Sequence, residues 1–200
     1  MLKPKDKAAP RVDGRRTRGE DNRRRIVDAL CKLVERGRAM PSAEDVAAEA
    51  GVGLRTVFRH FADMETLYAE ISERMVAVIR PIIAQPFTSS GWQEQLAELA
   101  ERRSHVFERI LPFKIAGDAH RAGSAFLTNE QKTIVKMQRE SLRGVLPAKI
   151  IQDRARFDAL DLVLSLESWR RLRTDQGLSV RDARAAVRAV VEAVTSSSLG

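Results

Sequence analysis

The segment that most constrains the fold is residues 42–61, in which two short apolar stripes at helical spacing are separated by a glycine. Ser42, with Asp45 three residues later, is a capping-box pattern that opens the first helix. Gly51 ends this helix after about two turns, because glycine readily adopts the left-handed conformation of a helix C-terminus. The apolar positions of the first helix are Val46, Ala47 and Ala50. The pattern predicts two short helices joined by a tight turn.

The second helix of the pair begins at Gly53, and its apolar positions at i, i+3 and i+7 are Leu54, Val57 and Phe61. A helix-turn-helix needs a small residue where the helices cross, a glycine in the turn and buried apolar groups that fix the angle. The residues that meet these requirements, in order, are Ala47, Gly51, Val52 and Val57. The second helix is therefore expected to be the one that enters the major groove of DNA.

The exposed face of this second helix carries side chains suited to DNA. Arg55 can donate two hydrogen bonds to guanine O6 and N7, and Leu54 can contact a thymine methyl group. Contacts to phosphates hold a protein in register without reading the sequence. The expected phosphate anchors are Thr56, Arg59 and His60.

The run from Ser42 to Leu67 resembles the DNA-binding domain of the tetracycline-repressor (TetR) family. The residues that carry the resemblance are Val46-Ala47, Gly51-Val52, Thr56-Val57-Phe58 and His60-Phe61. The resemblance implies a homodimer on a palindromic operator, released when a small molecule binds the larger domain, and most members of the family repress transcription. Two positions depart from the family pattern, since this chain has Phe58 in place of tyrosine and Met64 in place of lysine.

Each of these two substitutions removes a possible phosphate contact, which main-chain N–H groups at the start of the next helix could replace. The complete set of expected DNA-binding residues, including two from the N-terminal arm, is Ser42, Gly53, Leu54, Arg55, Thr56, Phe58, Arg59, His60, Met64, Arg16 and Arg18.

Composition predicts an all-α chain, because helix-forming residues dominate and long β-branched runs are missing. We expect a flexible basic arm (1–20), a three-helix DNA-binding domain (21–67) and a larger helical ligand-binding and dimerisation domain (68–200). Caps and punctuation predict about nine helices in total. After a first helix from Asp21 to Gly37 and one that starts at Asp63, the expected helices are roughly 90–110, 112–121, 128–146, 154–174 and 179–195.

Positive charge is concentrated at the N-terminus, where residues 1–25 carry ten Lys and Arg against four Asp and Glu, in a chain of net charge +8. A polyanion such as nucleic acid is a natural partner for such a segment. Arg15, Arg16 and Arg18 could follow the minor groove next to the half-site. The alternative is a solubilising tail.

The larger domain is expected to hold the effector pocket and the dimer interface. Large apolar residues could form the walls of a pocket, although most such residues are simply core. The expected pocket residues are Trp92, Leu96, Leu99, Phe107, Phe113, Phe126 and Met137. The resemblance implies a four-helix dimer bundle built from the last two helices of each subunit. The interface residues expected there, with an intramolecular core as the alternative, are Leu164, Trp169, Val187 and Val191.

Catalysis is not expected, since the sequence contains no G-x-S-x-G, H-E-x-x-H, Walker or Rossmann pattern. No metal or cofactor is expected either, because His105 and His120 fall on different predicted helices without a carboxylate cluster. The single Cys31 and the absence of an apolar leader or spanning segment predict a cytoplasmic protein. Two alternatives stay open: the same fold without an effector or controlled by a protein partner, and a less specific DNA-binding protein.

Overall fold

A computed structural model describes residues 14–121 and 124–196, and within these ranges it contains helices and no strand. The helices are α1 (Gly14–Glu35), α2 (Ala43–Ala50), α3 (Leu54–His60), α4 (Met64–Ile83), α5 (Trp92–Arg121), α6 (Ala125–Arg143), α7 (Ala148–Gln152), α8 (Arg154–Val163), α9 (Leu166–Arg170), the π-helical turn η1 (Arg171–Asp175) and α10 (Val180–Ser196). The predicted all-α fold is confirmed. None of the helices in the described ranges is long and apolar enough to cross a membrane.

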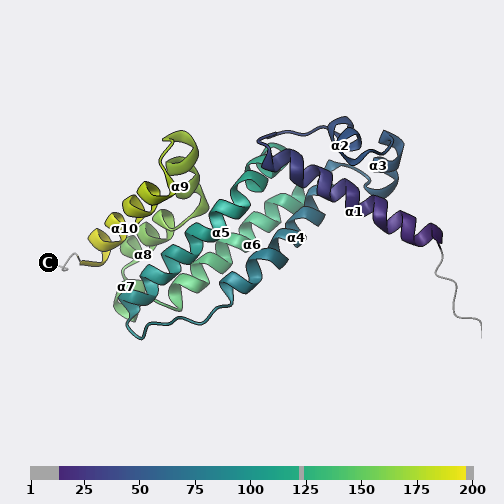
Figure 1. The fold of residues 1–200 in the computed structure, drawn as a ribbon. Helices are drawn as coiled ribbons and strands as arrows, with labels where there is room; N and C mark the ends of the chain where they lie inside the picture. Colours follow the sequence, from purple (N-terminus) through teal and green to yellow (C-terminus); the bar gives the residue numbers. More distant parts are fainter. Residues whose placement is uncertain (1–13, 122–123, 197–200) are drawn as a thin grey trace, which may run out of the picture.

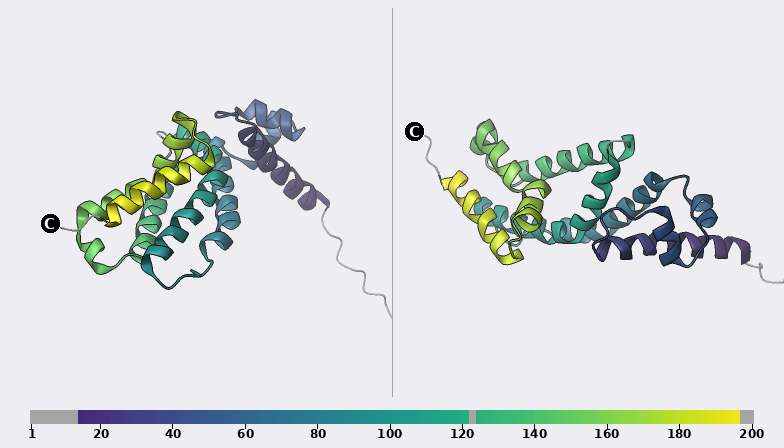
Figure 2. Two further views of the ribbon diagram at one scale, coloured as in Figure 1. Left: turned by 60° about the vertical axis from the view of Figure 1, so that its left-hand side comes forward. Right: turned by 90° about the horizontal axis from the view of Figure 1, so that it is seen from above.

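The molecule is elongated, with α1–α3 at one end, α8–α10 at the other and α4–α6 between them (Figures 1 and 2). Two apolar cores correspond to these two ends. The first core joins α1–α4 and also takes in Phe113 and Ala116 of α5 and Leu127 of α6. The second core joins α5–α10. The single helix α5 therefore contributes side chains to both cores.

The boundary between the two cores falls inside α4. Tyr68 and Ile71 are 3% and 2% exposed and belong to the first core, although the expected DNA-binding domain ends at residue 67. Met75, one turn further on, touches both cores. Helix α4 is thus shared between the two parts of the chain, as its apolar positions at steps of about four residues suggest.

Helix α1 begins at Gly14, seven residues before the expected start at Asp21. The stretch expected to be a flexible arm up to residue 20 is therefore helical from residue 14 onward. Extending an existing helix costs little, because each added residue gains one backbone hydrogen bond without a new nucleation step. The rest of the expected arm, residues 1–13, lies outside the described part of the chain.

Three expected helix boundaries in the larger domain are wrong. Helix α5 continues through Pro112 instead of ending near Ile110, and α6 is capped by Ser124, not Thr128. The expected helix over 154–174 is interrupted at Leu164, after which Ser165 caps α9. A proline inside a helix costs roughly 3 kcal/mol, and the burial of Leu111 and Phe113 beside it offsets this cost at about 1.5–3 kcal/mol each.

Gly51 provides a test of the turn between α2 and α3. Its φ of +62° is in the left-handed region, and an added Cβ would lie 3.0 Å from Nη2 of Arg25. We expect Gly51→Ala to lower the free energy of unfolding in urea by about 1–2 kcal/mol. The control is Gly19→Ala within α1, where a Cβ meets nothing within 4 Å and alanine should stabilise the helix by about 0.5–1 kcal/mol. Effects of the same sign at both positions would contradict this account of the turn.

Candidate nucleic-acid interface and effector cavity

The α2–turn–α3 unit is fixed from inside by apolar side chains and at its turn by backbone hydrogen bonds. Ser42 caps α2 in a complete capping box with Asp45, as predicted. The Gly51 N–H donates to carbonyl oxygens of the last turn of α2, and Val52 N–H donates to Ala47 O at 3.0 Å. Val57, in α3, is only 2% exposed. These contacts set the orientation of α3 relative to α2.

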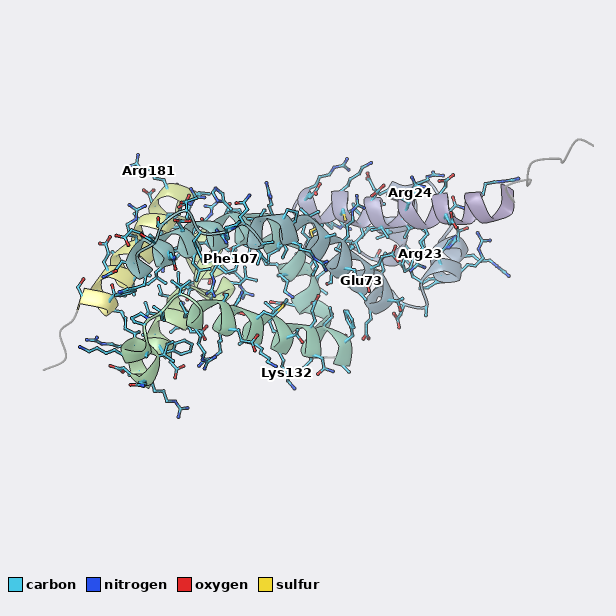
Figure 3. The ribbon with its side chains drawn as sticks, turned by 90° about the horizontal axis from the view of Figure 1, so that it is seen from below. Arg23, Arg24, Glu73, Phe107, Lys132 and Arg181 are labelled. Atoms are coloured by element: carbon cyan, nitrogen blue, oxygen red, sulfur yellow. The ribbon has the colours of Figure 1, made fainter. Side chains whose placement is uncertain are left out.

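Two arginines of α1 hold this unit in place, and the sequence interpretation missed both by counting them with the charge of the arm. Arg25 Nη2 donates to the carbonyl oxygens of Ala50 at 2.6 Å and Gly51 at 3.3 Å. Arg23, labelled in Figure 3, donates from Nη1 to His60 O at 3.0 Å and lies over the Phe61 ring, 4.5 Å from its centroid.

Arg23 also forms an ion pair with Glu70 of α4. It therefore connects α1, the end of α3 and α4. The signal that could have identified it is its spacing, since it precedes Ile26 and Leu30 by three and seven residues and so lies beside the buried stripe of α1.

The arginines of α3 differ from those of α1 in their exposure and in their contacts. Arg55 and Arg59 are both exposed, and neither has an ion pair or hydrogen bond within the described part of the chain. Two large apolar side chains, Leu54 at 36% and Phe58 at 49% exposed, lie on the same short helix. Leu54 is thus accessible to a partner rather than buried on the inward side, while Thr56 is half-buried.

His60 does not have the position expected of a phosphate anchor. Its Nε2 atom is buried and has no hydrogen-bond partner among the residues that the structure describes. Burial, and after it the charges of Arg59 and Arg23, lower the pKa of His60 below its ordinary value. An imidazole whose Nε2 atom is covered and whose charged form is disfavoured offers little to a phosphate group.

The start of α4 is already capped by a carboxylate. Asp63 accepts hydrogen bonds from Thr66 N and Thr66 Oγ1, both at 2.8 Å, and the first of these holds its pKa below the usual range. Met64 follows as the first helical residue and is half-buried. Because a negative charge occupies this helix terminus, it is less suited to bind a phosphate than the sequence suggested.

The remaining expected DNA contacts lie at the two edges of the unit. Ser42 is exposed, and so is Gly53, where an added Cβ would meet nothing within 4 Å, so a phosphate can approach the backbone closely there. Arg16 lies in the first turns of α1, but its side chain is outside the described part of the chain, whereas Arg18 is exposed.

A protein-family model described as bacterial regulatory proteins, tetR family, matches residues 26–71. The chain therefore carries a DNA-binding domain of the tetR family. The matched residues run from α1 through the helix-turn-helix to Ile71, the last buried residue that α4 contributes to the first core. The protein is a DNA-binding transcriptional regulator, as the resemblance implied, and the family consists of regulators and not of enzymes. A comparison with curated proteins gives no match.

The part of the chain that follows the matched domain contains a cavity of about 540 Å³ between α5, the α8–α9 connection and α10. Trp92, Leu96 and Phe107 line it, as expected of pocket residues, and Phe107 is labelled on α5 in Figure 3. The apolar wall is completed by residues from the other elements, including Leu164, Trp169, Val187 and Val191. A cavity of this volume is in the range of small-molecule sites.

The other four expected pocket residues lie elsewhere. Leu99 is buried in the second core without lining the cavity, and Phe113 belongs to the first core. Phe126 and Met137, on α6, are 41% and 54% exposed. The reason is the helical phase of α6, which starts at Ala125 and turns Leu127 and Leu142 inward instead.

The four residues expected at a dimer interface are buried within the single chain. Leu164, Trp169, Val187 and Val191 are between 2% and 8% exposed and belong to the second core, which is the intramolecular alternative. Trp169 Nε1 donates to Glu108 Oε1 at 2.8 Å, and this carboxylate also accepts from Arg173. The hydrogen bond from Arg173, and then that from Trp169, help to hold the pKa of Glu108 below its usual value.

One charged side chain lies deep beside this cavity. Arg103 of α5 is 7% exposed and donates from Nη1 to Leu164 O at 3.0 Å and from Nη2 to Ser141 Oγ at 2.9 Å and to Gln138 O. Burial lowers its pKa from the ordinary value to about 10. It remains a cation at neutral pH.

Proposed function

We propose that this TetR-family chain is a homodimeric repressor that binds a palindromic operator and is released by a small molecule held in the 540 Å³ cavity. The observation that supports the DNA-reading role is a difference between the arginines of α1 and those of α3. Arg23 and Arg25 are used within the fold, whereas Arg55 and Arg59 of α3 are exposed and have no partner in the described ranges. Free cations on the second helix of a helix-turn-helix are available to bases and phosphates.

Dimerisation is proposed through the outer faces of α8 and α10, which pack against each other and lie at the end of the molecule away from α3 (Figure 1). Leu162 of α8 is 65% exposed and Val190 of α10 is 44% exposed. Two copies related by a two-fold axis could bury these side chains and present two α3 helices to successive half-sites. This replaces the interface residues expected from the sequence.

The cavity is proposed as the effector site because α5 leads from it to the DNA-binding end. Phe107 lines the cavity, and Phe113 and Ala116, within three turns of it on the same helix, lie in the core of the DNA-binding domain. A ligand in the cavity that changes the position of α5 would therefore also change the core of the DNA-binding domain. We place the protein in the cytoplasm, where its operator is, and assign it no catalytic activity.

The test of base reading is Arg55→Ala, compared with Arg59→Ala and with the exposed Arg109→Ala on α5 as the neutral control. An operator is first selected from random duplexes, and binding is then measured on single-base variants across a salt series. Arg55→Ala should cost about 1–3 kcal/mol and relax preference at one position, whereas Arg59→Ala should weaken all sequences alike and reduce the salt slope by about one. Uniform weakening by Arg55→Ala would favour the less specific DNA-binding protein instead.

A further inference from the structure

The cavity combines apolar walls with one buried cation, and this combination limits what can bind there. Trp92, Leu96, Phe107 and Trp169 present aromatic and aliphatic surface, whereas Arg103 also lines the cavity and is 7% exposed. An arginine in such a site has lost most of its hydration. Asp161 is close enough to raise the pKa of Arg103, but its carboxylate forms an ion pair with Arg139 and none with Arg103 within the described residues.

The hydrogen bonds of Arg103 are incomplete. A guanidinium group has five N–H donors, and Arg103 finds three acceptors, namely Leu164 O, Gln138 O and Ser141 Oγ. Two N–H groups are therefore left without an acceptor among the described residues. All three acceptors are neutral, so none of the hydrogen bonds of Arg103 is made to a counterion.

Carboxylates do occur at this cavity, but they are placed differently. Glu94 and Glu192 line it and are exposed, so water can solvate their charges. Glu101 is half-buried and forms an ion pair with Arg184 at 2.7 Å. Electrostatic interactions are stronger in a buried environment than at a hydrated surface. Arg103 therefore determines which ligand charge the cavity favours.

We infer that the effector of this protein is a hydrophobic carboxylic acid, bound with its carboxylate on Arg103 and its apolar body against the two tryptophans. The inference rests on the proposed effector site and adds the chemical class of its ligand. A carboxylate accepts a charge-assisted hydrogen bond from a guanidinium N–H and neutralises the group, which is worth most where water is excluded.

The competing explanation is that Arg103 only ties α5 to α6 and to the end of α8 through its three acceptors. In that role Arg103 would require no anion, and the affinity of the cavity for a ligand would not depend on the charge of the ligand. The two explanations therefore differ in head-group preference, which can be measured on the unaltered protein.

Tryptophan fluorescence can report on binding, because the only two tryptophans of the chain, Trp92 and Trp169, both line the cavity. Intrinsic fluorescence is followed during titration of the full chain with decanoate and, separately, with decan-1-ol, which differs only at the head group. We expect decanoate to bind at least about tenfold more tightly, as expected for a charge-assisted hydrogen-bonded pair. Equal affinities, tighter binding of the alcohol or no fluorescence response to either probe would overturn the inference.

Variants assign the preference to Arg103. Arg103→Gln should reduce the preference for decanoate over decan-1-ol to less than about threefold. Arg103→Lys should retain part of this preference, because only lysine keeps the positive charge. Arg109→Gln, an exposed arginine on the same helix, should leave it unchanged. If Arg103→Gln fails to fold by circular dichroism, the comparison of head groups on the unaltered protein still decides.

Operator release separates this inference from the proposed function. Decanoate that binds with the expected preference but leaves the operator complex intact would contradict effector release and uphold the anion site. Release of the operator by decanoate and decan-1-ol at equal concentrations would uphold an effector-controlled repressor and overturn the carboxylate specificity.

Discussion

Phe61→Ala is expected to lower the free energy of unfolding by about 3–5 kcal/mol and to abolish operator binding at growth temperature. Phe61 follows α3, is 1% exposed and packs in the first core with the guanidinium of Arg23 over its ring. Its removal leaves a cavity and also takes away the surface against which Arg23 is held. Since small domains are stable by only about 5–15 kcal/mol, this is a large share of the total.

The matched control is Phe58→Ala, the same substitution three residues earlier, on the exposed side of α3. Phe58 is 49% exposed, so its removal should change stability by less than about 1 kcal/mol. Chemical denaturation with both variants, followed by circular dichroism, gives the comparison. Comparable losses at the two positions would show that the core of the DNA-binding domain is not organised around Phe61.

The double substitution Leu162→Glu and Val190→Glu is expected to convert the proposed dimer into a monomer and to reduce operator affinity at least about 100-fold. The reason is that a second half-site contact is effectively intramolecular only while the two DNA-binding units are joined. Four buried carboxylates would be introduced into a two-fold interface at positions that are 65% and 44% exposed in the single chain. Sedimentation velocity and operator titration measure the two effects.

Met137→Glu is the control for that experiment, because Met137 is a comparably exposed apolar residue, at 54%, but lies on α6. It should leave both the oligomeric state and the affinity unchanged. If the double variant remains dimeric, the interface lies outside the outer faces of α8 and α10. If Met137→Glu gave the monomer instead, the interface would include the outer face of α6.

Features that depend on neighbouring residues were predictable from the sequence. The capping box of Ser42, the left-handed turn at Gly51 and the cap at Asp63 are local, and all three are confirmed. Periodicity also identified α10 to within a residue at each end. The second helix of the DNA-binding unit was found correctly for the same reason, since its length is set by Gly53 before it and Phe61 after it.

Features that depend on tertiary packing were not predictable in the same way. Pro112 was interpreted as a helix boundary, but burial on either side keeps α5 continuous. Val187 lies on an apolar stripe that could equally cover a subunit core or a dimer interface, and only the position of α5 and α8 decides that it is core. Similarly, Arg23 and Arg103 were overlooked because the atoms they bind are 35 to 61 residues away.

The continuity of α5 makes the proposed regulation reciprocal. If a ligand in the cavity weakens operator binding through this helix by some factor, thermodynamic linkage requires operator DNA to weaken ligand binding by that same factor. Protein seated on its operator would then respond at a higher effector concentration than free protein in the same cell. The concentration at which transcription begins would consequently be set by the DNA sequence as well as by the pocket, so two operators of different strength would be released at different times as one effector accumulates.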